Sequence, residues 1–372
     1  MHDRILLNFS NIRTGGGLQV AISFLIELNA HHLSRCYYVI LSSAVAEALP
    51  SKVFQNSNLK ITIFDSIGIR GLFSKFSFSQ AQYHVSFTLF GPKYTLTRSK
   101  NEIVGFAQPW ISTPINPLYK QMGVIDRFVT DLKFFIQSLF FSRADRLVVE
   151  LDHVKKGLAK NCLLGQIPVT VVKNALSSLY YDKETWCEIE DIKEYKGLKL
   201  GLIARDYNHK NIGVLGDVAK LLNNKYGIDV RFYFTLNSDE WKHHKVRFGE
   251  YGISVGSLSV YQCPRFYELM DGIVFPSLLE CFSATPLEAL FMGKPLFASD
   301  RGFVRDVCGD YAFYFDPIDP HSIAAVIASF FLGPSRDLKL AEDATKHVQH
   351  FSTAPQRALD YISIIESVVD RK

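Results

Sequence analysis

Short apolar runs of β-strand length alternate with helix-like stretches along the whole chain of 372 residues. The runs at residues 5–9 and 272–275 are apolar throughout or nearly so, which indicates strands buried within a sheet. Strands that alternate with helices predict parallel sheets, and therefore an α/β fold. The expected strands are residues 5–9, 37–41, 60–64, 84–89, 102–107, 146–150, 169–173, 198–203, 229–234, 272–275, 295–299 and 312–315.

The length of the chain bounds the number of domains. A chain of 372 residues is too long for one hydrophobic core, and 48% hydrophobic residues suffice for two. The strands fall into two sets, separated by a polar, acid-rich stretch within residues 175–197. We therefore predict a first domain over residues 1–178, a second over 179–352 and a C-terminal helical segment over 353–372.

Two glutamates follow the strand predicted at 272–275. Glu280 lies in the loop after this strand, and Glu288 lies about one turn into the next helix. Ligands of parallel α/β sheets bind beyond the carboxyl ends of strands. The small residues Ser283 and Ala284 lie between the glutamates, so their N–H groups can approach a phosphate at the helix N-terminus. Because carboxylates accept hydrogen bonds from vicinal hydroxyls, the arrangement suits the sugar, diphosphate and ribose of a nucleotide-sugar.

Two further segments place cations and glycines directly after predicted strands. Arg205 and Lys210 follow the first strand of the second set, where two cations can clamp a diphosphate and stabilise it as a leaving group. Gly15, Gly16 and Gly17 follow the first strand of the chain, and a glycine-rich turn lets the backbone approach a ligand closely. This turn lacks the six-residue dinucleotide fingerprint, so NAD binding is not expected.

The segment from Phe275 to Ser299 resembles the donor-site signature of the glycosyl transferases group 1 family, whose members are retaining enzymes of the GT-B fold. The family pattern is Pro-Ser, then Glu, seven residues, Glu-Ala, and later Gly-x-Pro before a strand, and this sequence matches each position. The strand that leads to Arg205 and Lys210, and the Gly-Gly loop near the start, also resemble the family. The resemblance covers the whole chain, closely in the second half and loosely in the first.

This resemblance implies two Rossmann-like domains that face each other across a cleft, with the segment 353–372 crossing back to the first domain. It implies that Arg205 and Lys210 hold the donor diphosphate, that Glu280 orients the donor sugar and that Glu288 binds the ribose. The glycine loop would approach from the first domain. No metal or other cofactor is implied, because fixed cations replace Mg²⁺. Backbone N–H groups would complete the phosphate site at Phe282, Ser283, Ala284 and Thr285.

One position departs from the family pattern. Many members carry a His near the transferred sugar, after the fourth or fifth N-terminal strand, whereas Ala107 and Gln108 stand at the equivalent place here. Gln108 can hydrogen-bond to a sugar hydroxyl, but it cannot act as an acid or base at neutral pH. His153 and His209 lie nearby in the sequence and are expected to be loop residues. The departure leaves the identity of the donor sugar open.

The charge of the chain divides unevenly. Residues 1–178 carry 19 Lys+Arg and 10 Asp+Glu, a difference of +9, and the remainder carries 22 and 27, a difference of −5, which together give the net +4. Segments 69–78 and 128–143 mix Phe with Lys and Arg, a composition typical of a helix in an anionic membrane interface. A core helix whose Phe face packs on the sheet is the alternative, which we favour for 128–143, while 69–78 stays open. No nucleic-acid motif is present, so we expect no nucleic-acid partner.

The cysteines and the apolar runs bear on location. The six cysteines show no paired metal-binding spacing and are expected to be free thiols in a reducing cytoplasm. The sequence shows neither a signal peptide nor an apolar run of membrane-spanning length. We therefore expect a cytoplasmic protein whose contact with the cytoplasmic membrane face, if any, is peripheral.

Together these features predict a hexosyltransferase-type glycosyltransferase that moves a sugar from a nucleotide-sugar to an acceptor hydroxyl, with retention at the anomeric carbon and without a metal. The basic, aromatic-rich first domain suits a lipid-linked glycan acceptor, as in O-antigen or capsule assembly. Two other classes stay open. They are a nucleotide-sugar epimerase, which shares the two-domain architecture, and a glycan-binding homologue without activity.

Overall fold

The computed structural model describes residues 4–13, 15–31, 35–66, 82–95, 97–190, 192, 195–333, 338–349 and 351–369. Contacts between residues divide the chain into two compact units. Unit 1 comprises Met1–Pro114, Gly123–Ala175 and Ser352–Lys372, whereas unit 2 comprises Ile115–Met122 and Leu176–Phe351. The boundaries predicted from the sequence lie at 178/179 and 352/353. The assignment of residues 115–122 to unit 2 was not predicted.

Unit 1 is built on a parallel sheet with the strand order β3-β2-β1-β4-β5-β6-β7. All five residues of the interior strand β1 are buried, so other elements cover both faces of the sheet at this strand. The strands are β1 (Ile5–Phe9), β2 (Tyr37–Leu41), β3 (Leu59–Ile63), β4 (Gln82–Thr88), β5 (Arg98–Gly105), β6 (Arg146–Val149) and β7 (Val169–Val171).

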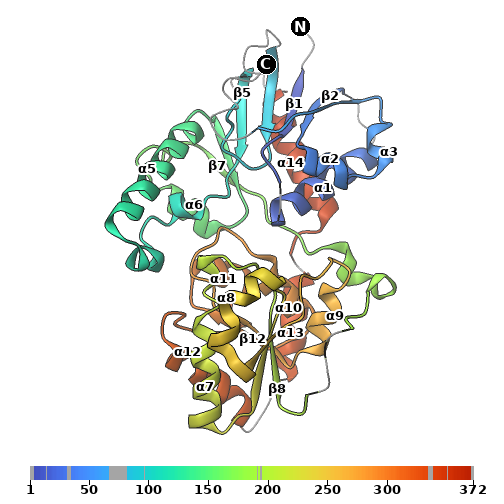
Figure 1. The fold of residues 1–372 in the computed structure, drawn as a ribbon. Coiled ribbons are helices and arrows are strands. Elements are labelled where there is room, and N and C mark those ends of the chain that lie inside the picture. The colour runs from blue at the N-terminus through green and yellow to red at the C-terminus, as the bar shows by residue number, and fades with distance from the viewer. Residues whose placement is uncertain are drawn as a thin grey trace. The chain divides into compact units, whose positions relative to one another are not determined.

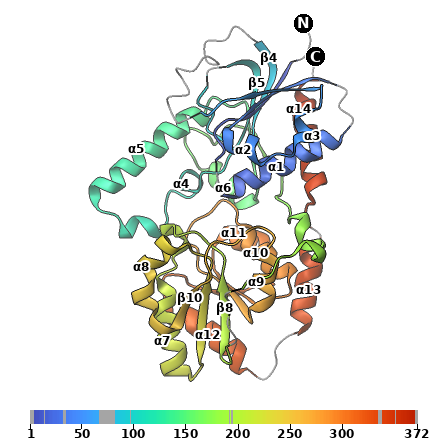
Figure 2. The same cartoon turned by 45° about the vertical axis from the view of Figure 1, so that its right-hand side comes forward.

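The helices of unit 1 come from all three of its chain segments (Figure 1). They are α1 (Gly15–Ala30), α2 (Ser43–Ala48), α3 (Ser51–Phe54), α4 (Pro109–Ser112), α5 (Val124–Phe141), α6 (Asp152–Leu158) and α14 (Ala354–Val369). Helix α14 lies beside α1, as both views show (Figures 1 and 2). Its Tyr361 ring lies 5.3 Å from both Phe24 of α1 and Phe87 of β4, measured between ring centroids. Helix α14 is therefore part of the core of unit 1.

A buried polar network also attaches α14 to the sheet. Glu150 follows β6, Asn174 follows β7, and Arg357 lies on α14, and all three side chains are buried. The amide nitrogen of Asn174 donates to Glu150 Oε1 at 2.6 Å, and Arg357 Nη1 donates to Asn174 Oδ1. Burial raises the pKa of Glu150 to about 7, although the Arg357 charge and the Asn174 bond act in the opposite direction.

Unit 2 is built on a second parallel sheet, with the strand order β10-β9-β8-β11-β12-β13. Its strands are β8 (Leu198–Leu202), β9 (Val230–Phe234), β10 (Gly252–Ser254), β11 (Gly272–Phe275), β12 (Leu296–Ser299) and β13 (Phe313–Phe315). Its α-helices are α7 (Val214–Tyr226), α8 (Ser238–Phe248), α9 (Cys263–Leu269), α10 (Ala284–Phe291), α11 (Gly302–Cys308), α12 (Pro320–Leu332) and α13 (Leu338–Gln349). Its 3₁₀ turns are η2 (Pro117–Gln121), η3 (Ser178–Tyr181), η4 (Lys183–Thr185), η5 (Asn208–Lys210) and η6 (Gly249–Tyr251).

Each sheet reverses its strand order at one place. In unit 1 the chain runs from β1 outward to β3 and then returns to β4 on the other side of β1. In unit 2 it runs from β8 outward to β10 and then returns to β11 on the other side of β8. In open parallel sheets, ligands bind beyond the carboxyl ends of the strands at such a switch point. In unit 2, a ligand site is therefore expected at the residues that follow β8 and β11.

The structure confirms the α/β fold with two parallel sheets and every strand expected from the sequence, with small shifts at the ends. The short strand β10 was not expected. Two expectations are wrong in detail. Gly15, Gly16 and Gly17 form the first turn of α1 and not a turn before it. The apolar face of α5 is exposed, so the helix in segment 128–143 is not the core helix that we favoured. Segment 69–78 lies outside the described residues.

Candidate functional site

An ion pair lies at the switch point of the unit 2 sheet. Lys210 ends the 3₁₀ turn η5 after β8, and Glu280 lies in the loop after the neighbouring strand β11. Lys210 Nζ lies 2.7 Å from Glu280 Oε1, and the two side chains are only 14% and 9% exposed. The hydroxyl of Ser277 donates to the same carboxylate oxygen at 2.6 Å. The structure thus brings together two residues that are 70 positions apart in the sequence.

Backbone contacts hold the two loops of this ion pair against each other. The carbonyl oxygen of His209 accepts a hydrogen bond from the Leu278 N–H at 2.7 Å, and it also lies 3.1 Å from the Ser277 hydroxyl oxygen. The Lys210 ammonium also lies 5.5 Å from the centroid of the Phe275 ring. Burial lowers the pKa of the His209 imidazole, and nearby Glu280 partly opposes this effect. His209 is therefore a neighbour of the ion pair.

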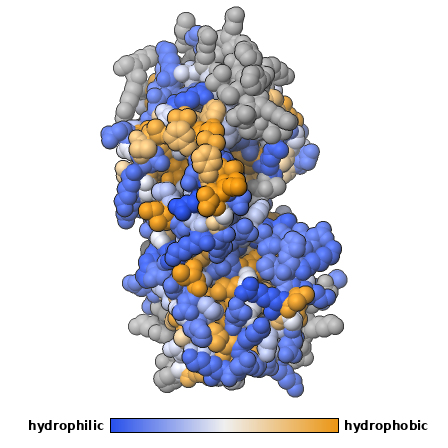
Figure 3. Space-filling model, turned by 60° about the vertical axis from the view of Figure 1, so that its left-hand side comes forward, coloured by the Kyte–Doolittle hydropathy of each residue, from blue (hydrophilic) through white to orange (hydrophobic). Residues whose placement is uncertain are grey.

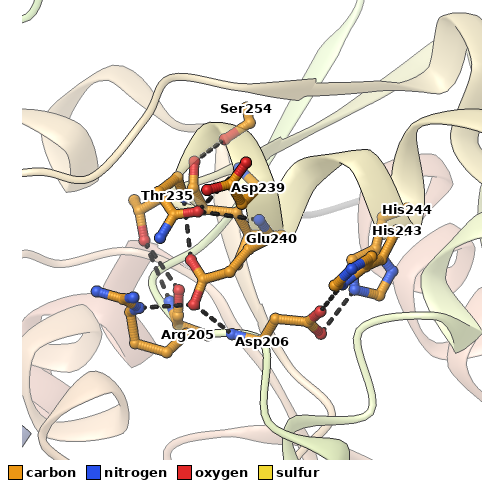
Figure 4. Close-up of polar contacts among 11 residues, drawn as sticks. Arg205, Asp206, Thr235, Asp239, Glu240, His243, His244 and Ser254 are labelled. Atoms are coloured by element: carbon orange, nitrogen blue, oxygen red, sulfur yellow. Dashed lines mark hydrogen bonds and ion pairs between the residues drawn. The ribbon is translucent and has the colours of Figure 1, made fainter.

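Arg205, the other predicted phosphate ligand, has a different partner. Its Nε lies 2.7 Å from Glu240 Oε1, and the Arg205 side chain is 56% exposed (Figure 4). Glu240 is the third residue of α8, and its second carboxylate oxygen accepts the Asn237 N–H at 3.0 Å in a capping box. One carboxylate therefore both caps α8 and holds the Arg205 guanidinium. Glu240 was missed in the sequence analysis, although the pattern Asn237-x-x-Glu240 would have marked it as a helix start.

Asp206 fastens the same loop to the next part of α8. Its two carboxylate oxygens lie 2.7 Å from His244 Nε2 and 3.1 Å from His243 Nδ1 (Figure 4). Burial raises the pKa of Asp206, but the bonds to His244 and His243 outweigh this effect and leave the pKa below its ordinary value. Asp206 therefore stays ionised near neutral pH. Both histidines were also missed in the sequence analysis.

The N-terminus of α10 lies directly after Glu280 in the sequence. Ser283 is the N-cap residue, and its side chain makes no capping hydrogen bond. Ala284 is exposed, Phe282 is half-buried, and the hydroxyl of buried Thr285 donates to the Ile203 carbonyl at 3.4 Å. N–H groups in the first turn of a helix, together with the helix dipole, favour an anion. The start of α10 is therefore a place where an anion would be favoured.

Glu288 lies on α10 and points toward α9. Its Oε2 accepts a hydrogen bond from the Tyr267 hydroxyl at 2.7 Å. Burial raises the pKa of Glu288, and the hydrogen bonds from Tyr267 and Tyr180 act in the opposite direction. A carboxylate has about four acceptor positions, so two tyrosine hydroxyls still leave it able to accept from a further hydroxyl. The predicted ribose contact and a purely structural contact with α9 are both compatible with this position.

Residues 192–347 match the family model of the glycosyl transferases group 1. This stretch contains Arg205, Lys210, Glu280 and Glu288, together with Glu240, the partner of Arg205. The match supports the glycosyltransferase class for the part of the chain that holds the ion pair. No curated protein matches the chain.

Solved structures resemble the whole chain. A sucrose-phosphate synthase from Thermosynechococcus elongatus is 12% identical, with a TM-score of 0.71 and complete coverage of both chains. A glycosyltransferase from Rickettsia africae is 13% identical, with a TM-score of 0.68 and 99% coverage of each chain. Anabaena HepE in complex with UDP and glucose is 13% identical, with a TM-score of 0.68 and coverage of 98% of this chain and 100% of its own. These likenesses establish the GT-B fold.

Unit 1 holds the remaining predicted residues. Gly15 has a φ of 71° and begins α1, which follows the switch-point strand β1. A Cβ atom on Gly17 would lie 3.5 Å from the Phe90 ring, whereas none on Gly15 or Gly16 would meet an atom within 4 Å. Gln108 precedes α4, is half-buried and makes no side-chain capping bond. The space around Gly15 and Gly16 is therefore open at the position of a Cβ atom.

Three further features concern the residues that the structure describes: metal ligands, membrane spans and thiols. Within that part of the chain, no three His, Cys, Asp or Glu side chains gather as a set that could hold a metal ion. None of its helices has both the length and the apolar character to cross a membrane. None of the six cysteines forms a disulfide bond, and the buried Cys281 follows Glu280 in the sequence.

Proposed function

We propose that the protein is a retaining hexosyltransferase that moves a sugar from a nucleotide-sugar to an acceptor hydroxyl. The observation that carries this proposal is the Lys210–Glu280 ion pair, which lies at the switch point of the unit 2 sheet and inside the family-matched stretch. A cation for a diphosphate and a carboxylate for sugar hydroxyls are the groups that a nucleotide-sugar requires. Here the two groups lie side by side, 2.7 Å apart.

In this proposal Lys210 and Glu280 bind each other in the absence of the donor, and each binds a part of the donor in its presence. While no donor is bound, Glu280 neutralises the Lys210 ammonium. A bound diphosphate would take over Lys210, and the sugar hydroxyls would take over Glu280. Arg205 would bind the diphosphate through its terminal nitrogens, because Glu240 uses its Nε–H. Fixed cations of this kind stabilise the negative charge that develops on the leaving group.

We propose a front-face substitution for the transfer step. The acceptor oxygen forms a bond to the anomeric carbon on the face that the diphosphate leaves, and the bond from this carbon to the phosphate oxygen breaks. The nucleoside diphosphate departs with the electron pair, and the acceptor hydroxyl gives its proton to the departing phosphate oxygen. No side chain has to act as a base, which agrees with Gln108 in place of a histidine. Arg205 and Lys210 lower the energy of the separated charge.

Other predicted residues would complete the donor site. We assign the ribose to Glu288, and the phosphate also to backbone N–H groups in the stretch from Phe282 to Thr285, at the start of α10. From unit 1, the glycines at the start of α1 and the amide of Gln108 would meet the donor or the acceptor. No metal ion is needed in this arrangement, because Arg205 and Lys210 supply its charge.

The identity of the donor is open, and one neighbour suggests where to begin. Structures of Anabaena HepE contain UDP, glucose and UDP-glucose. We therefore propose UDP-glucose as the first donor to test. The basic, aromatic-rich unit 1 supports a lipid-linked glycan acceptor, polysaccharide assembly of the O-antigen or capsule type, and cytoplasmic location with peripheral contact at an anionic membrane.

An experiment with labelled UDP-glucose separates the proposed function from its two alternatives. A transferase releases UDP and, with an acceptor sugar, forms an α-glycoside whose anomeric configuration NMR spectroscopy identifies. An epimerase would instead yield an altered nucleotide-sugar without UDP release, and a glycan-binding homologue would release nothing from any UDP-, GDP- or dTDP-sugar. Activity should survive EDTA. Loss with EDTA that Mn²⁺ or Mg²⁺ restores would contradict the proposed leaving-group chemistry.

A further inference from the structure

Helix α5 of unit 1 presents a continuous apolar face away from the protein. Eight of its apolar side chains are between 40% and 87% exposed. At 100° per residue, their positions cover an arc of about 140° around the helix without a polar interruption. Orange side chains gather on this face of unit 1 in the space-filling view (Figure 3). The eight residues, called the α5 face below, are Val124, Ile125, Phe128, Val129, Leu132, Phe135, Ile136 and Leu139.

The opposite side of α5 holds the helix on unit 1. Phe134 stacks on Trp110 with ring centroids 5.6 Å apart, and Phe141 lies 4.8 Å from Phe106. Ser138 and Phe141 are buried, whereas no residue of the α5 face is. An amphipathic helix normally buries its apolar arc against the core. Here a separate aromatic side attaches the helix, and the wider apolar arc is left to the outside.

The size of the α5 face exceeds what a soluble surface normally shows. With roughly 150–200 Å² for each large apolar side chain, the exposed fractions amount to an area on the order of 800 Å². The largest apolar patch on a typical monomer measures roughly 300–600 Å². Because the α5 face curves around a single helix, a partner that covers all of it must follow this curvature. A second α5 helix would cover only a narrow seam of the arc, whereas a fluid lipid layer can cover all of it.

The charges around the α5 face fit a lipid surface. Asp126, Arg127, Asp131 and Lys133 flank the arc, one acid and one base on each side, and all four are exposed. Long basic side chains at the edges of an apolar face can reach lipid phosphates while the face enters the acyl region. Residues 1–178, which include α5, carry a charge difference of +9, and this attracts an anionic surface.

We infer that the α5 face is a bilayer-docking surface, by which the protein lies on an anionic membrane with α5 in the plane of the interface. Insertion of the apolar side chains supplies most of the binding, and the basic charge of unit 1 adds to it. The inference deepens the proposed function, because it places the acceptor at a lipid surface. It does not depend on catalysis, since binding to vesicles can be measured without a donor or an acceptor.

Vesicle flotation with the full-length protein tests this inference. The probes are vesicles of phosphatidylcholine with 30% phosphatidylglycerol, and vesicles of phosphatidylcholine alone. The double variant Phe128→Ser/Phe135→Ser removes two rings from the centre of the α5 face. We expect its partition onto anionic vesicles to fall at least thirtyfold. Lys133→Gln should lower the partition by only about fivefold. The control Val246→Ser removes a 94% exposed side chain on α8 and should change nothing.

Two further measurements keep the result interpretable. The melting temperature of the double variant should equal that of the wild type, because the two rings are exposed, and its affinity for UDP should be unchanged. Absence of wild-type flotation with both vesicle types would overturn the inference, as would a double variant that floats like the wild type. A dimer in light scattering that the double variant abolishes, without vesicle binding, would assign the α5 face to a second copy of the chain. A transferase that binds no vesicles would leave the proposed sugar transfer intact and remove only its membrane contact.

Discussion

Removal of either partner of the Lys210–Glu280 pair tests the site most directly. The two atoms are 2.7 Å apart, and both side chains are more than four-fifths buried. At an effective dielectric constant of about 20, their attraction is about 6 kcal/mol. Much of this is offset by the cost of taking both charges out of water. Loss of one partner leaves the other charge buried without its counter-ion, so we expect Lys210→Gln and Glu280→Gln each to lower the free energy of unfolding by about 3 kcal/mol.

Nucleotide binding should distinguish the two variants. Lys210→Gln removes a phosphate ligand, so the affinity for UDP should fall at least tenfold, as expected for a charge-assisted contact of about 1.5–3 kcal/mol. Glu280→Gln instead frees Lys210 from its partner, so the affinity for UDP should stay the same or rise while kcat falls. Isothermal titration with UDP and steady-state kinetics provide these two readouts. Equal weakening of UDP binding in both variants would refute the assigned roles.

Urea unfolding followed by tryptophan fluorescence measures the stability term. Trp186 and Trp241, two of the three tryptophans, lie in unit 2 and report on the unit that holds the ion pair. Lys242→Gln is the matched control, because its ion pair with Asp239 is exposed at both partners and should contribute little. If Lys210→Gln unfolded at the same urea concentration as this control, the reasoning from burial would be wrong.

Four further predictions concern charged residues outside this pair. Arg205→Ala should lower turnover more than tenfold and leave the melting temperature nearly unchanged, since the side chain is 56% exposed; wild-type turnover would remove it from the site. Glu240→Gln, which relieves Arg205 of its carboxylate partner, should bind UDP at least as tightly as the wild type in titration calorimetry. Glu288→Gln should mainly raise KM for the donor, whereas a lower melting temperature with unchanged nucleotide affinity would assign it to helix packing. Glu150 has a folded pKa of about 7 against an ordinary 4.5, so the folded state binds more protons between these values. Stability measured by urea unfolding should therefore fall as pH rises from about 4.5 to about 7, by on the order of 3 kcal/mol, and Glu150→Gln should flatten this slope.

The strands were predictable because a strand that is buried on both faces of a sheet is a continuous apolar run in the sequence. Strand β10 was not predicted because its three residues, Gly-Ile-Ser, contain a single large apolar side chain. The start of α1 was misplaced because glycines disfavour a helix by only about 1 kcal/mol each. Packing of the buried Phe24 and Leu25 further along α1 outweighs that cost.

The candidate site was predictable where strand topology decides it. Lys210 and Glu280 follow neighbouring strands, so their proximity follows from the sheet order once the strands are known. The partner of Arg205 depends on how α8 packs, which no local pattern specifies. The same limit applies to α5. The sequence shows which side chains share a face of the helix, but only the packing of Phe134 and Phe141 decides which face is turned outward.

The attachment of α14 to unit 1 has a consequence for the order in which the protein folds during synthesis. The core of unit 1 needs Tyr361 against Phe24 and Phe87, and Arg357 beside Asn174, yet the ribosome makes these α14 residues only after it has made all of unit 2. Domains usually fold in the order of their synthesis. Here unit 2 can complete its core first. Until α14 is made, the sheet of unit 1 has an uncovered hydrophobic groove. That interval is when a chaperone would find exposed apolar surface on the nascent chain.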